Sequence, residues 1–156
     1  MIAMKEARHK QIEGTVNAND IKGTRVLTNQ GKEIGKVAEL RLDPQELHLA
    51  GILIKRGLIE EDLFVGSEYI KGISDKGVVL KMTPYTELVG MKVFDINGKE
   101  IGKVKQVNRF DKTNGVVSIV VDRGFGKRDL LIQKESIDTV GENIILAQST
   151  EVLTPA

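Results

Sequence analysis

The sequence predicts an all-β protein made of two tandem small β-barrels. The main observation is an identical repeat, because the seven residues Gly31–Val37 recur unchanged at Gly98–Val104. In both copies, short β-branched and aliphatic runs follow, separated by glycine-containing turns. Self-similarity at a fixed spacing indicates a duplicated structural unit. Five or six short strands with turns every roughly 8–12 residues are typical of a small barrel or sandwich.

The 156 residues are therefore divided into two domains and their connections. We expect a flexible leader at 1–20, a first barrel at 21–82, a linker at 83–87, a second barrel at 88–147 and a tail at 148–156. We expect this leader to be a mobile terminus rather than a partner-binding segment. Domains of about 60 residues are marginal when isolated, so we expect these two to pack on each other, on a second chain, or both.

The elements of each barrel follow from local patterns. In the first copy we expect strands at 25–28, 34–42, 49–54, 63–65 and 78–80; strands at 116–121, 130–132 and 144–146 are expected in the second. One helical turn is expected at 67–70 and another at 134–137. Asn97-Gly98 predicts a hairpin turn, since both residues tolerate positive φ. Gly35, inside a strand, predicts a bulge or a close backbone approach.

Composition excludes several classes of function. The 23 Lys and Arg residues nearly balance the 22 Asp and Glu residues, which argues against a polyanion-binding protein driven by bulk charge. The absence of cysteine excludes disulfides and thiolate chemistry. No apolar run approaches the roughly 20 residues that span a bilayer, and no apolar signal-peptide core is present. We expect a cytoplasmic protein without direct membrane insertion.

No pattern for catalysis, metal binding or cofactor binding is found. Gly124–Lys127 lacks the spacing of a phosphate-binding loop and lies between two predicted strands rather than before a helix. The adjacent acids Glu60–Asp62 are typical of a solvated loop rather than of an acid–base pair. His9 and His48 have no partner pattern. We therefore expect no enzymatic activity, no cofactor and no metal.

Two equivalent loops carry the candidate partner-binding residues. These residues are Arg56, Leu58 and Ile59 in the first loop and Arg123, Phe125, Lys127 and Arg128 in the second. Exposed apolar side chains beside arginine are typical of interface cores. The alternative, which we favour, is that Leu58 and Phe125 fold back and cap the barrel ends, because large apolar residues are normally buried.

The charges of these loops allow two further interpretations. The first loop is acidic and the second basic, which favours head-to-tail contact between the barrels or between chains. The basic residues could also form a patch for RNA, but Glu60–Asp62, Asp122 and Asp129 lie in the same loops. A solvated surface of mixed charge is the favoured interpretation.

The repeated residues resemble the PRC-barrel domain, named after the cytoplasmic part of the photosynthetic reaction centre H subunit. The resemblance covers roughly 21–82 and 88–147. It is carried by Val26, Gly31, Ile34, Gly35, Val37 and Asp43, and by Val93, Gly98, Ile101, Gly102, Val104 and Asp111. These turn glycines and core aliphatics specify a fold rather than an activity.

The resemblance implies a non-enzymatic interaction or scaffold module, most similar to stand-alone archaeal PRC-barrel proteins. Some of these act in cell division, so the implied partners are SepF, the membrane anchor of the FtsZ ring, or another PRC-barrel protein. A homo- or heterodimer recruited to the division site is expected. The alternative is an RNA-binding or ribosome-assembly factor related to the C-terminal domain of the bacterial ribosome-maturation protein. A small-molecule pocket is a third interpretation, for which the sequence offers no polar constellation.

Overall fold

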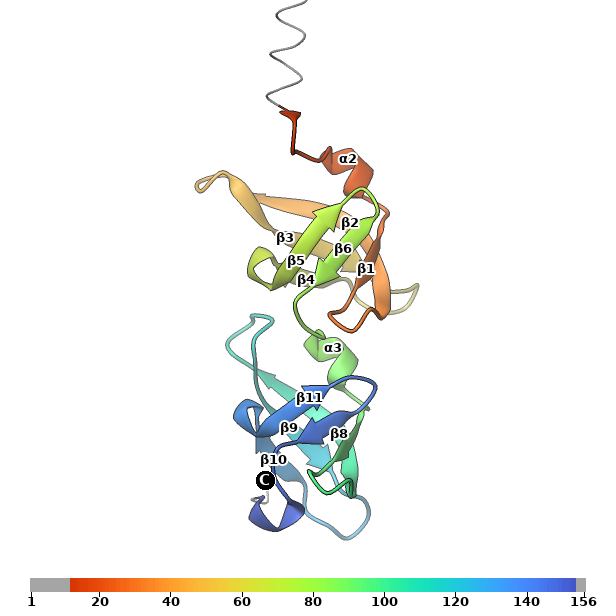
Figure 1. Cartoon of the computed structure of the whole chain (residues 1–156), viewed down its shortest axis with the longest axis vertical. Helices are drawn as coiled ribbons and strands as arrows, with labels where there is room; N and C mark the ends of the chain where they lie inside the picture. Colours follow the sequence, from red (N-terminus) through yellow and green to blue (C-terminus); the bar gives the residue numbers. More distant parts are fainter. Residues whose placement is uncertain (1–11, 154–156) are drawn as a thin grey trace, which may run out of the picture. The chain divides into compact units, whose positions relative to one another are not determined.

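The computed structural model describes residues 12–153, which form two six-stranded sheets (Figure 1). The strands of the first sheet are β1 (Arg25–Leu27), β2 (Glu33–Asp43), β3 (His48–Lys55), β4 (Leu63–Gly66), β5 (Ile70–Ser74) and β6 (Gly77–Leu80). The strands of the second are β7 (Lys92–Phe94), β8 (Glu100–Arg109), β9 (Val116–Asp122), β10 (Leu130–Gln133), β11 (Ile137–Val140) and β12 (Ile144–Leu146). The expected all-β class with two tandem barrel-like domains is confirmed.

The two expected helical turns are also present. They are the 3₁₀ turns η1 (Ser67–Tyr69) and η2 (Lys134–Ser136), each between the fourth and fifth strand of its sheet. The described chain divides into two compact units, one of residues 12–27 and 33–80 and the other of residues 28–32 and 81–153. Each unit is described by itself below.

Both sheets have the same strand order. The order is β4-β3-β2-β1-β6-β5 in the first sheet and β10-β9-β8-β7-β12-β11 in the second. Neighbouring strands are antiparallel, except that β1 runs parallel to β6 and β7 runs parallel to β12. Val26 lies opposite Gly35, as Val93 lies opposite Gly102. The duplicated sequence therefore folds as a duplicated structure, register included.

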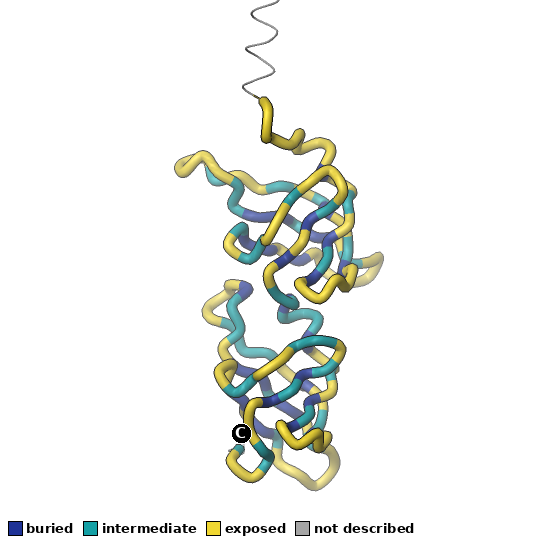
Figure 2. The backbone as a smooth tube through the Cα atoms, in the orientation of Figure 1, coloured by how far each residue is buried: buried dark blue, intermediate teal, exposed yellow. Residues whose placement is uncertain are grey.

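The core of each unit is built from alternating aliphatic residues of these strands. Figure 2 shows buried residues along the strands and exposed residues in the connecting loops. In the first unit the buried apolar residues are Ile21, Val26, Ile34, Val37, Ile52, Ile54, Leu63, Val65, Val78 and Leu80. In the second they are Leu88, Val93, Ile101, Val104, Ile119, Val121, Leu130, Ile132, Ile144 and Leu146. The repeated motif thus supplies two core aliphatics to each unit.

The middle glycine of the repeated motif is required by a close backbone approach. A Cβ added to Gly35 would overlap the carbonyl oxygen of Lys55, and one added to Gly102 would overlap that of Asp122. A side chain therefore cannot be accommodated at either position without displacing the neighbouring strand. The expectation at Gly35 is confirmed as a close approach.

The β7–β8 turn differs in detail from the expected one. Gly98 has φ +81°, and Asn97 is not among the described residues with positive φ. The turn is closed by the carboxylate of Asp95, whose Oδ1 accepts hydrogen bonds from the backbone N–H groups of Asn97 and Lys99, both at 2.9 Å. The Asp95 carboxylate therefore stabilises the turn, and Asn97 does not need the positive φ that the sequence predicted.

A short helix precedes each barrel, and the sequence patterns do not indicate either one. These are α2 (Ala18–Ile21), which begins in the expected leader and ends one residue after it, and α3 (Tyr85–Leu88), which begins in the expected linker and ends one residue after it. The side chain of Asn17 accepts a hydrogen bond from the Asn19 N–H and caps α2. Each helix ends in a buried aliphatic residue, Ile21 or Leu88. Single turns of this length carry too little periodicity to be recognised in a sequence.

Candidate interaction surface

The β3–β4 loop, residues 56–62, presents two apolar side chains to solvent. Leu58 and Ile59 each retain 98% of their accessible surface. The favoured expectation that Leu58 caps the barrel is therefore wrong. The strand residues that flank the loop, Ile54 and Leu63, are already buried and fill this part of the core.

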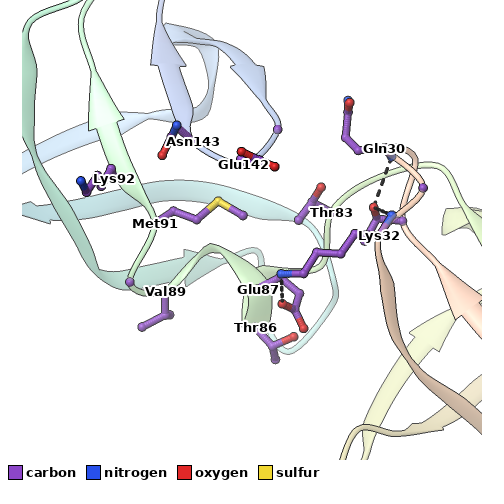
Figure 3. A pocket seen from close by; sticks show the side chains of 14 residues that line it. Gln30, Lys32, Thr83, Thr86, Glu87, Val89, Met91, Lys92, Glu142 and Asn143 are labelled. Atoms are coloured by element: carbon purple, nitrogen blue, oxygen red, sulfur yellow. Dashed lines mark hydrogen bonds and ion pairs between the residues drawn. The ribbon is translucent and has the colours of Figure 1, made fainter.

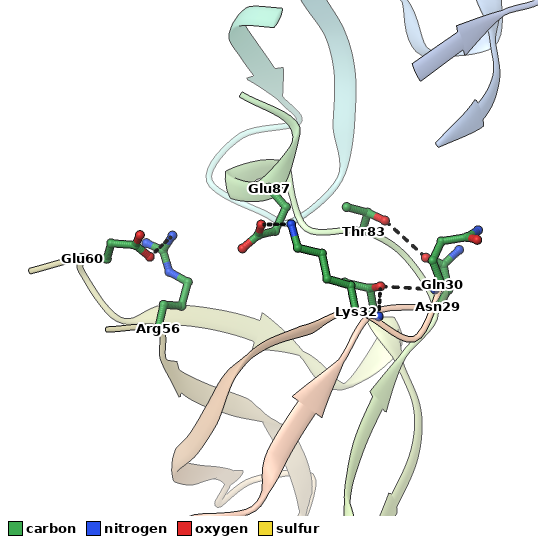
Figure 4. A network of polar contacts seen from close by, with 8 residues as sticks. Asn29, Gln30, Lys32, Arg56, Glu60, Thr83 and Glu87 are labelled. Atoms are coloured by element: carbon green, nitrogen blue, oxygen red, sulfur yellow. Dashed lines mark hydrogen bonds and ion pairs between the residues drawn. The ribbon is translucent and has the colours of Figure 1, made fainter. Parts of the chain in front are cut away.

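Arg56 holds the β3–β4 loop in shape rather than pointing outward. Its Nε and Nη2 donate hydrogen bonds to the carbonyl oxygen of Glu61 at 3.1 and 2.7 Å. Its Nη1 lies 3.5 Å from Oε2 of Glu60 (Figure 4). The Arg56 side chain is only 14% exposed, so its guanidinium is committed to the loop itself. Bidentate donation to one carbonyl fixes the backbone that carries the apolar residues.

The β9–β10 loop, residues 123–129, presents Phe125 in the same way. Phe125 is fully exposed and lies between Gly124 at φ +99° and Gly126 at φ +78°. Oδ1 of Asp122 accepts a hydrogen bond from the Gly124 N–H at 2.9 Å. The expectation of capping is therefore wrong for Phe125 as well. Left-handed glycines on both sides turn the phenylalanine away from the barrel.

The charges of the β9–β10 loop are partly neutralised at its end. Asp129 Oδ2 accepts a hydrogen bond from Nζ of Lys105 at 3.0 Å, and this contact raises the pKa of Lys105. Arg123 is half-buried, whereas Lys127 and Arg128 are exposed. Within the described part of the chain, no ion pair joins either exposed side chain to an acid.

The β3–β4 loop has the opposite charge. Glu60 is paired with Arg56, but Glu61 and Asp62 are exposed, and their side chains form no ion pair among residues 12–153. The two loops therefore present free charges of opposite sign beside exposed apolar groups. The sequence shows which residue types these loops contain, but only the structure shows which of their side chains are exposed.

A shallow hollow lies at the base of each loop, and the repeated motif lines it. In the first unit a hollow of about 460 Å³ is lined by residues 33–36 and 55–58. In the second, a hollow of about 380 Å³ is lined by residues 100–103, 122–124 and 127. Their equivalent walls come from identical tetrapeptides in the two copies. The sequence patterns did not indicate these hollows, because the same residues also supply the core aliphatics Ile34 and Ile101 and the close-approach glycines Gly35 and Gly102.

A further open hollow of about 830 Å³ lies within the second unit (Figure 3). The turn 28–32, α3 and the turn 141–143 contribute to its lining. Lys32 and Glu87 neutralise each other there, with 3.1 Å between Nζ and Oε2, and the Thr83 hydroxyl donates to Oδ1 of Asn29 at 3.3 Å (Figure 4). These contacts order the turn and the linker segment.

The described histidine, His48, makes a local contact with the backbone. His48 is exposed on β3, with Nδ1 3.0 Å from the carbonyl oxygen of Leu49, and His9 lies outside the described residues. No group of three His, Cys, Asp or Glu side chains is arranged to hold a metal in this part of the chain. None of its helices is long and apolar enough to cross a membrane.

Comparison with known proteins gives one family. A model of the PRC-barrel domain matches residues 13–84 and again residues 80–153. Among solved structures, a chain described as a 16S ribosomal RNA processing protein, RimM, from Pseudomonas aeruginosa aligns with a TM-score of 0.35 and 16% identity. That alignment covers 72% of this chain and 77% of the other. A search of curated proteins found no match.

Proposed function

Because the chain belongs to the PRC-barrel domain family and carries two copies of the domain, we propose that it is a non-enzymatic protein-interaction module. The observation that carries this proposal is the exposure of Leu58, Ile59 and Phe125 on the tips of two loops. Exposed large apolar groups rimmed by charged residues are typical of protein interfaces. These side chains add nothing to the core, and docking of a partner would remove their apolar surface from water.

Three described side chains have shifted pKa values, and each shift fits a structural role. The pKa values of Asp43 and Asp95 are lowered, in each case mainly because backbone N–H groups donate to the carboxylate. The pKa of Lys105 is raised by its contact with Asp129. These shifts all stabilise the charged forms in turns and pairs, whereas catalytic acids and bases need values moved toward neutral pH.

A more specific form of the proposal is an archaeal cell-division adaptor that binds SepF or another PRC-barrel protein. The family resemblance alone motivates this form. The competing candidate is RNA or ribosome-assembly binding, which the exposed Lys127 and Arg128 would support through phosphate contacts. The net charge of +1 and the acidic residues of the first loop oppose it.

The test is affinity capture from the source lysate with full-length protein, with and without nuclease. The variants are Leu58→Ser/Ile59→Ser and Phe125→Ser, and Phe110→Ser is the matched control because Phe110 is also 70% exposed. We expect both loop variants to lose captured proteins, with unchanged melting temperatures and no effect of nuclease. Recovery of division-ring proteins would support the specific form. Ribosomal proteins that disappear with nuclease, or with modest added salt, would overturn the proposal in favour of RNA binding.

A further inference from the structure

The two loops of this chain are complementary to each other. The β3–β4 loop offers free carboxylates at Glu61 and Asp62, next to Leu58 and Ile59. The β9–β10 loop offers free cations at Lys127 and Arg128. Opposite charges that flank apolar groups are the arrangement that steers and orients two surfaces toward each other.

The apolar parts of the loops are complementary as well. Phe125 projects from its loop on a Gly-Phe-Gly tip, with no contact to its own core. The hollow in the first unit is lined by residues 33–36 and 55–58, Leu58 among them, and its lining surface is mostly apolar. Insertion of the Phe125 ring into this hollow would exclude water from the contact.

We propose that the β9–β10 loop of one copy of this chain docks on the β3–β4 loop of a second copy. In this contact Phe125 enters the hollow beside Leu58, while Lys127 and Arg128 face Glu61 and Asp62. The inference rests on the proposed function, since it names the partner of the same loops. The contact is heterologous, because it joins two different surfaces. It closes into a pair if both contacts form reciprocally, and it extends into a chain of copies if they do not.

The charge pattern gives a test that does not depend on net charge. Glu61→Lys/Asp62→Lys makes both loops basic, and Lys127→Glu/Arg128→Glu makes both acidic. The quadruple variant combines all four changes, exchanges the charges of the two loops and restores the original net charge of +1. Lys71→Glu/Lys134→Glu is the control, because it changes two exposed lysines outside the loops by the same net charge as the acidic variant.

Sedimentation equilibrium of the full chain over a dilution series is the measurement. We expect a mass that rises above one chain with concentration and falls as salt screens the charged rim. Each double loop variant should weaken self-association by about tenfold or more, the quadruple variant should restore it, and the control should match the wild type. Phe125→Ser should weaken it without a change in melting temperature.

Three results would overturn the inference. They are a mass of one chain at every concentration, a quadruple variant as weak as the doubles, and a control as weak as the loop variants. If the chain stays monomeric while Phe125→Ser still loses captured proteins, the partner is a different protein and the proposed function stands. If neither Phe125→Ser nor Leu58→Ser/Ile59→Ser changes capture or mass, both proposals fail.

Discussion

Asp95 binds Thr150 across 55 residues of sequence, and the contact ties the C-terminal segment to the β7–β8 turn. Oδ2 of Asp95 accepts hydrogen bonds from the Thr150 N–H at 3.2 Å and from its hydroxyl at 2.8 Å. The same carboxylate caps the β7–β8 turn through Oδ1. The sequence predicts a tail from residue 148, yet the 3₁₀ turn η3 (Thr150–Val152) forms there and Leu153 packs against the core. One buried acid thus orders two segments of the unit.

The turn between β1 and β2 supplies the matched variant for a test of this contact. Thr28 occupies the equivalent turn, where its hydroxyl oxygen accepts from the N–H groups of Gln30 and Lys32, both at 3.2 Å. Asp95→Thr should therefore keep the turn but lose the bond to Thr150. We expect faster amide exchange in residues 148–153 and a lower melting temperature, with little change in exchange at Lys99. Equal exchange in wild type and variant would show that packing of Leu153 alone holds the segment.

Asp95 also predicts how stability depends on pH. Its pKa is below the ordinary value, chiefly because the Lys99 N–H donates to it, so the folded chain binds the proton less readily than the unfolded chain. The stabilisation is complete above the unfolded pKa and is lost as pH falls from about 4 through the folded pKa. Acid titration of the free energy of unfolding should show a shallower fall for Asp95→Thr than for wild type. Parallel curves would assign the acid sensitivity elsewhere, first of all to Asp43, whose pKa is also lowered.

The sequence predicted most of the fold because the repeat and the turn residues are local signals. The repeat located Ile34 and Val37 in the core, and glycine at position 35 marked the close approach. Strands β5 and β11 were less evident, because only two residues of β5, Ile70 and Ile73, face inward and its remaining positions are polar or glycine.

The candidate surface was only half predictable. The residue types in the sequence identified both loops as candidates. The general preference of apolar residues for burial predicted that Leu58 and Phe125 would be buried, but both side chains are exposed. Arg56 was proposed as a partner-binding residue, but its guanidinium donates two hydrogen bonds to the Glu61 carbonyl. These bonds depend on the loop folding back on itself, which the sequence does not show. Tertiary closure, and not composition, decides which groups a loop exposes.

The close backbone approach at the repeated glycine predicts a large effect of a small change. Gly102→Ala would place a methyl group against the Asp122 carbonyl, so β8 and β9 must separate. We expect a loss of about 1–3 kcal/mol in the free energy of unfolding, measured by urea denaturation. Gly72→Ala is the control, since a Cβ there meets no atom within 4 Å and its φ is not positive. A Gly102→Ala variant as stable as the control would mean that the strands adjust freely.

Leu47 predicts the opposite outcome, a stabilising substitution. It lies at the end of the β2–β3 turn with φ +55°, a conformation that costs a leucine about 1–2 kcal/mol, and its side chain is 85% exposed. Asparagine tolerates this conformation, so Leu47→Asn should raise the free energy of unfolding by up to about 1 kcal/mol in urea denaturation. Asp111, at φ +56° in the second unit, already suits its conformation, and Asp111→Asn should change little. A destabilised Leu47→Asn variant would show that the exposed leucine makes a contact that outweighs its backbone strain. A gain in stability together with a loss of captured proteins would add this turn to the interaction surface.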